Sequence, residues 1–130
     1  MRAFLDANVI VRHLTQDPPD MGHRATAFLA QEEELLVPDL IVAEVVYVLE
    51  SFYRVPRSEV AEAVRSLIGW PTVQVVDARL LLRAIEVYEV AAIDFADAYL
   101  IASAEITDVG LIVSFDRDLD RISTVRRLEP

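Results

Sequence analysis

The alternation of short apolar runs with longer helical segments most constrains how this chain can fold. Apolar runs at 3–5, 35–37, 72–76 and 111–113 read as strands, with 124–125 as a fifth, edge strand. Uniformly apolar strands separated by helices indicate a buried parallel sheet with helices on both faces. We therefore expect an α/β fold with three α/β/α layers around a short, mostly parallel central sheet. Helices are expected at 8–15, 21–33, 39–53, 56–69, 77–90 and 94–106, with a helical turn at 116–119.

The length of 130 residues suits one domain, so residues 1–130 are expected to form a single domain. No apolar stretch approaches the roughly 18–20 residues of a membrane span, and the sequence does not begin with a signal-like segment. We expect a soluble, cytoplasmic protein with no membrane association.

Residue usage limits the chemistry. The chain has no cysteine, which excludes disulfides, thiolate nucleophiles and zinc sites built from cysteine. It has two histidines, so a metal site would consist mainly of oxygen ligands. Oxygen ligands favour Mg²⁺ or Mn²⁺.

The charge balance also limits the partners. The net charge is −10, and all 12 basic residues are arginines. An acidic chain without a basic run is not a general nucleic-acid binder, so any phosphate contact must be local, through arginine or bound metal. The hydrophobic share of 54% predicts that part of the surface meets another subunit or a partner.

Acidic residues follow two of the predicted strands. Asp6 comes directly after the first run, and Asp116 comes shortly after the run at 111–113. In open parallel sheets, functional crevices lie beyond the carboxyl ends of the strands. The structural alternatives are an N-cap for Asp6 and a solvated acidic loop for Asp116, Asp118 and Asp120.

Glu44 has apolar or aromatic helical neighbours three and four residues away: Leu40, Ile41, Tyr47 and Val48. We expect this carboxylate to be partly buried, which is unfavourable unless it is paired or binds metal. The alternatives are a position at the edge of the buried face or an ion pair with an arginine.

Asp97 falls at the third helical position after Asp94, as in a capping box. The helix dipole favours an acid there for purely structural reasons. The same dipole keeps Asp97 ionised, as a metal ligand must be.

A parallel sheet would bring Asp6, Glu44, Asp97 and Asp116 to one end. Carboxylates held that closely repel one another unless a cation lies between them. A divalent cation relieves the repulsion and supports phosphodiester hydrolysis by activated water.

Four segments carry a family resemblance: 4–10, 38–45, 94–102 and 113–119. Together they resemble, in order, the four motifs of PIN-domain ribonucleases, and most closely those of VapC toxins from toxin–antitoxin pairs. The resemblance covers essentially the whole chain. It implies a metal-dependent endoribonuclease that acts as the toxin of a type II pair.

The resemblance assigns roles to particular residues. The metal-binding and catalytic acids would be Asp6, Glu44, Asp97 and Asp116, with Mg²⁺ or Mn²⁺ as the cofactor. Asn8 would orient the first acid, Ser114 would hydrogen-bond within the site, and Asp118 would replace Asp116 if that position is not used. The resemblance also implies a homodimer and a VapB-like antitoxin that inserts a peptide into the acidic groove.

The candidates for RNA contact are Arg12, Arg54 and Arg117, with His13 beside Arg12 and Arg57 near Arg54, because arginine suits phosphate. The alternative is that these residues are surface charges or ion-pair partners.

Other enzyme classes fit poorly. Haloacid-type phosphatases, receiver domains and P-loop enzymes each need a lysine that this chain lacks. The remaining alternative is a catalytically silent PIN-like binding or regulatory module.

Overall fold

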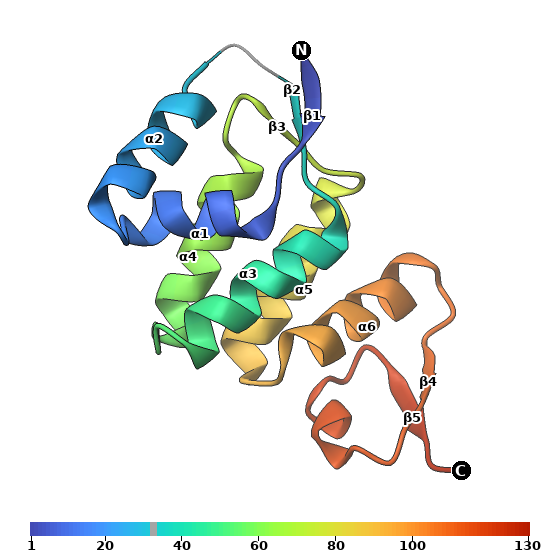
Figure 1. The fold of residues 1–130 in the computed structure, drawn as a ribbon. Helices are drawn as coiled ribbons and strands as arrows, with labels where there is room; N and C mark the ends of the chain where they lie inside the picture. Colours follow the sequence, from blue (N-terminus) through green and yellow to red (C-terminus); the bar gives the residue numbers. More distant parts are fainter. Residues whose placement is uncertain (32–33) are drawn as a thin grey trace. The chain divides into compact units, whose positions relative to one another are not determined.

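The computed structural model describes residues 1–31 and 34–130, which form two compact units (Figure 1). Unit 1 is Met1–Val76 and unit 2 is Asp77–Pro130. The last residues of the helix predicted at 21–33 lie outside the described residues.

Unit 1 is built around a three-stranded parallel sheet in the order β1-β2-β3. Leu35, at its centre, aligns with Ala3 on one side and Val73 on the other and is fully buried. The elements of unit 1 are β1 (Arg2–Phe4), α1 (Ala7–Thr15), α2 (Pro19–Leu29), β2 (Glu34–Leu36), α3 (Asp39–Ser51), α4 (Arg57–Ile68) and β3 (Val73–Gln74).

Unit 2 consists of a helical pair followed by a two-stranded parallel sheet. Helix α6 buries alanines at positions 98, 102 and 104, whose small side chains allow close packing, and α5 buries larger residues such as Ile85 and Tyr88. The elements of unit 2 are α5 (Ala78–Ala91), α6 (Phe95–Ile106), β4 (Leu111–Val113), the short 3₁₀ helix η1 (Arg117–Arg121) and β5 (Arg126–Leu128).

The predicted element order and the parallel strand pairing are confirmed, while several boundaries differ. Helix α2 starts at Pro19 rather than near residue 21, because proline is favoured in the first helical turn. Strand β3 is limited to Val73–Gln74, shorter than the run predicted at 72–76. The last strand is 126–128 rather than 124–125, since β4 begins at Leu111 and pairs it with Arg126.

Helix starts agree well with the capping signals in the sequence. Asp6 and Asp77 cap α1 and α5, and each accepts a hydrogen bond from a backbone N–H in the first turn. Asp94 occupies the predicted N-cap position of α6, but its side chain makes no capping bond. None of the described helices has both the length and the apolar character needed to span a membrane.

Candidate functional site

Two of the predicted acids lie together in unit 2. Asp97 is half-buried in the first turn of α6. Its pKa is raised, first by burial and then by the charge of Asp116, with Asp94 and a side-chain hydrogen bond with Asp116 adding to the shift. Two carboxyl groups therefore share one small volume, where a cation would be favoured.

The loop after β4 positions Asp116. The backbone N–H of Asp116 donates to Ser114 Oγ at 2.9 Å, and Asp116 Oδ1 accepts from the N–H of Asp118 at 2.9 Å. Asp116 is thus the N-cap of η1, and Ser114 accepts a local hydrogen bond from its backbone. These bonds fix the loop that holds the carboxylate.

The next two acids of the loop pair with arginines. Asp118 Oδ1 lies 3.2 Å from Arg121 Nη2, and Asp120 Oδ1 lies 3.0 Å from Arg127 Nε. The hydrogen bond from Arg127 also lowers the pKa of Asp120. Asp118 thus has an ion-pair partner, and its charge makes a smaller contribution at Asp97 than that of Asp116.

Asp6 lies at the junction of β1 and α1 in unit 1. Its Oδ1 accepts from the N–H of Ala7 at 2.8 Å, while the side chain as a whole is exposed. The N-cap role that the sequence offered as the structural alternative is thus present. It does not exclude metal binding, because a carboxylate has acceptor sites beyond one hydrogen bond.

The prediction that Glu44 is partly buried is wrong. Glu44 is exposed, and its neighbours Leu40 and Tyr47 are 79% and 68% exposed. Helix α3 buries a different face, made by Val42, Val45, Val46 and Leu49. Because α3 is apolar on more than one side, the neighbours of Glu44 did not identify the buried side.

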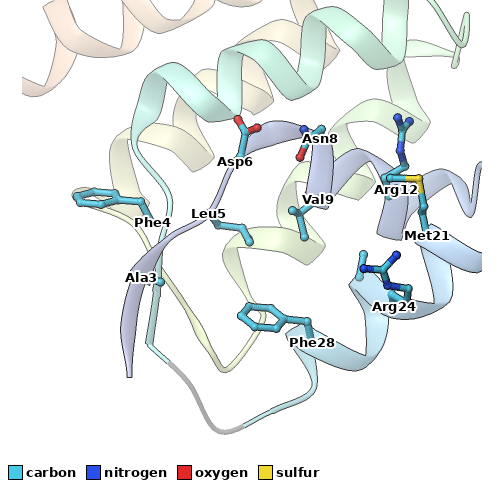
Figure 2. A pocket seen from close by; sticks show the side chains of 11 residues that line it. Ala3, Phe4, Leu5, Asp6, Asn8, Val9, Arg12, Met21, Arg24 and Phe28 are labelled. Carbon is cyan, nitrogen blue, oxygen red and sulfur yellow. The ribbon is translucent and has the colours of Figure 1, made fainter.

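Helix α1 links the surroundings of Asp6 and Glu44. A groove of about 540 Å³ is bordered by Asp6, Asn8 and Arg12 (Figure 2), and a smaller cavity of about 160 Å³ is bordered by Asn8, Arg12 and Glu44. Asn8 and Arg12 line both. Asn8, predicted to support the site, and Arg12, predicted to contact RNA, therefore lie between the two acids of unit 1.

The other basic candidates have different environments. His13 is held by a 2.7 Å hydrogen bond between Nδ1 and Thr26 Oγ1 and contacts the Trp70 ring edge-on at 5.2 Å. Burial lowers the pKa of His13, which disfavours the charged imidazolium that would attract phosphate. Arg54 and Arg117 are exposed, and Arg54 has a left-handed backbone conformation with φ of 53°.

Sequence reasoning missed Arg24, which lines the 540 Å³ groove together with Met21 and Phe28 of the same helix. The spacing of three and four residues was the available signal, since it places all three side chains on one face of α2.

The donor set suits a hard divalent cation. Unit 1 contains two of the predicted carboxylates and Asn8, and unit 2 contains the other two and Ser114. Oxygen donors of this kind favour Mg²⁺ or Mn²⁺. Within residues 1–31 and 34–130, no three acidic or histidine side chains are arranged to hold a metal ion. The convergence of all four acids stays a prediction.

A sequence model of one protein family, the PIN domain, matches residues 3–125 and so spans both units. The chain belongs to the PIN domain family. A comparison with curated proteins found no significant match. The helices and short three-stranded parallel sheet agree with the three-layer α/β/α class predicted from the sequence. PIN domains are generally nucleases and generally use divalent metal ions.

Proposed function

We propose that this PIN domain is a metal-dependent endoribonuclease with a Mg²⁺ or Mn²⁺ site formed by Asp6, Glu44, Asp97 and Asp116. The proposal rests on the electrostatics of Asp97, whose pKa is raised first by burial and then by the charge of nearby Asp116. Placing two carboxyl groups close together is unfavourable for folding alone. It is favourable for binding a cation.

The local structure around the acids supports this role. The N-terminal dipole of α6 favours the ionised form of Asp97. Ser114 and the N–H of Asp118 hold the Asp116 loop, and the N-cap geometry of α1 holds Asp6. Bound metal would supply a nucleophilic hydroxide and stabilise the leaving oxygen.

The substrate would be RNA, contacted locally through arginines. Arg12 borders the cavities beside Asp6 and Glu44, and Arg117 directly follows Asp116. Arg54 is a third exposed candidate. In a chain of net charge −10, these guanidinium groups would offset the repulsion between the acids and the phosphate backbone.

We further propose that the protein is a VapC-type toxin that forms a homodimer and is inhibited by a VapB-like antitoxin. The exposed apolar surface supports protein partners. In unit 1, Phe4, Leu40 and Phe52 are 74%, 79% and 75% exposed, and in unit 2 Phe115 is 70% exposed. Large apolar side chains in water are a feature of interaction surfaces.

The deciding experiment is cleavage of end-labelled single-stranded RNA by the purified protein. Cleavage should require Mg²⁺ or Mn²⁺, stop with chelator, and be lost in Asp97→Asn. Equal cleavage by Asp97→Asn, or cleavage in chelator, would overturn the metal mechanism. Metal binding by calorimetry without any cleavage would favour the silent module.

A further inference from the structure

The 540 Å³ groove of unit 1 combines an apolar wall with two cations. It lies among β1, α1 and α2, and Figure 2 shows Phe4, Leu5 and Phe28 at one end and Arg12 and Arg24 toward the other. Its volume falls within the roughly 300–1,000 Å³ typical of small-ligand sites. The groove is therefore large enough for one flat apolar group with an attached charge.

The two arginines of the groove are available for a ligand. Neither Arg12 nor Arg24 has an ion pair with any acid in the described part of the chain, whereas Arg2 pairs with Glu34 at 2.7 Å. Arg12 Nε is buried and has no hydrogen-bond partner among the described residues. A buried donor without an acceptor is unfavourable, and an anionic ligand would relieve it.

The groove also reaches one of the four proposed catalytic acids. Asp6 and Asn8 line it, and both belong to the start of α1 (Figure 2). A ligand in the groove would lie beside the proposed metal ligand. This ligand must be anionic at one end and apolar and flat at the other, and a nucleotide with an unpaired base has that chemistry.

We propose that this groove binds one nucleotide of single-stranded RNA next to the scissile bond, with Arg24 and Arg12 on the phosphate and Phe4 and Phe28 against the base. The inference rests on the proposed ribonuclease function and names the residues that select the substrate. A base within a duplex is stacked and paired, so it could not enter the groove. The site would therefore favour single strands.

Binding can be tested without cleavage by using fluorescence anisotropy with a labelled oligoribonucleotide, chelator and the Asp97→Asn background. Adding Arg24→Ala should raise Kd about tenfold. It should also reduce the slope of log affinity against log salt by about 0.7, as expected for one lost phosphate contact on a single strand. Arg79→Ala is the matched control, because Arg79 is an exposed arginine on α5 that does not line the groove.

The apolar wall predicts a different signature. Phe4→Ala should weaken binding about tenfold with an unchanged salt slope, and Phe4→Tyr should restore it, since tyrosine also stacks on bases. Phe4 is 74% exposed, so these substitutions should leave the fold intact, as thermal melts would verify.

The outcomes separate this inference from the proposed function. Arg24→Ala behaving like Arg79→Ala, or duplex RNA binding as well as single strands, would overturn the groove assignment even if RNA is cleaved. If Arg24→Ala weakens the binding of an acidic peptide but leaves RNA binding unchanged, the groove is a protein-docking surface. That result would also overturn the nucleotide assignment. If Arg24→Ala weakens RNA binding but the wild type cleaves no RNA, the groove assignment would be supported and the nuclease proposal refuted.

Discussion

The charge of Asp116 adds to burial in raising the pKa of Asp97, and the two acids lie at the starts of the helical segments η1 and α6. Helix starts favour ionised acids, whereas burial and the neighbouring charge oppose ionisation at Asp97. The folded protein therefore holds an electrostatic conflict that a bound cation would resolve.

Asp97→Asn should raise the Tm of the metal-free protein by a few degrees and lower RNA cleavage at least about 100-fold. The raised pKa means that the ionised form is disfavoured in the folded state, so folding stability falls as pH rises through that pKa. Asparagine removes this penalty and the ligand charge together. Thermal melts in chelator and cleavage assays would measure the two effects.

Asp108→Asn is the control for this substitution. Asp108 is exposed and has a φ of 59°, a conformation that asparagine also tolerates. Both its Tm and its activity should match the wild type. A lower Tm for Asp97→Asn would instead identify Asp97 as a structural hydrogen-bonding group.

Two substitutions of Asp6 should separate its contribution to stability from its contribution to RNA cleavage. Asp6→Asn keeps the N-cap of α1, whereas Asp6→Ala removes it at a cost of about 1 kcal/mol. Both should abolish cleavage, because both remove the proposed ligand charge. Denaturant unfolding should find only the alanine variant destabilised. Full activity in Asp6→Asn would reduce Asp6 to its capping role.

Glu44→Gln should abolish cleavage and change the free energy of unfolding by no more than about 0.5 kcal/mol, because Glu44 is exposed. Glu62→Gln on α4, also exposed, should leave both unchanged. Denaturant unfolding and RNA cleavage would be compared for the pair. An active Glu44→Gln enzyme would restrict the ligand set to the remaining acids.

Sequence reasoning predicted features that are set by local rules. Asp6 and Asp77 were recognisable helix starts because short acidic side chains satisfy free N–H groups. Uniformly apolar strands predicted parallel pairing, and the structure has it in both sheets. The position of Asp97 in the first helical turn was also evident from the residues before it.

Features that depend on packing between elements were not predictable. The exposure of Glu44 is set by which side of the apolar helix α3 meets the core, and apolar neighbours occur on both sides. Arg24 becomes notable only because α2, α1 and β1 enclose a groove beside Asp6. The arginine partners of Asp118 and Asp120 likewise appear only after η1 folds.

Divalent metal should stabilise the wild type by mass action and so raise its Tm. At a metal concentration of 100 times Kd, the free energy of unfolding should increase by about 2.7 kcal/mol. The effect should be greatly reduced in Asp97→Asn and in Asp116→Asn and unchanged in Asp108→Asn. Melts with Mn²⁺ and Mg²⁺ would measure it. A metal-induced shift that persists unchanged in both aspartate variants would place metal binding elsewhere.

The Arg83–Glu105 pair should stabilise unit 2 independently of catalysis. Arg83 Nε and Nη2 donate to the two carboxylate oxygens of Glu105 at 2.7 and 2.8 Å, and Thr124 donates a further hydrogen bond. The hydrogen bond from Arg83 is the largest cause that lowers the pKa of Glu105. Glu105→Gln should therefore destabilise the protein by about 1–3 kcal/mol, whereas Glu86→Gln should cost little because Glu86 is mostly exposed.

The lowered pKa of Glu105 also fixes the pH dependence of this contribution. The stabilisation is fully present above the ordinary glutamate pKa of about 4.3 and is lost as pH falls through the lower, folded-state value. The Tm difference between wild type and Glu105→Gln should thus be constant near neutral pH and shrink in acid. A difference that persists undiminished in strong acid would show that glutamine fails for steric reasons rather than through the lost charge.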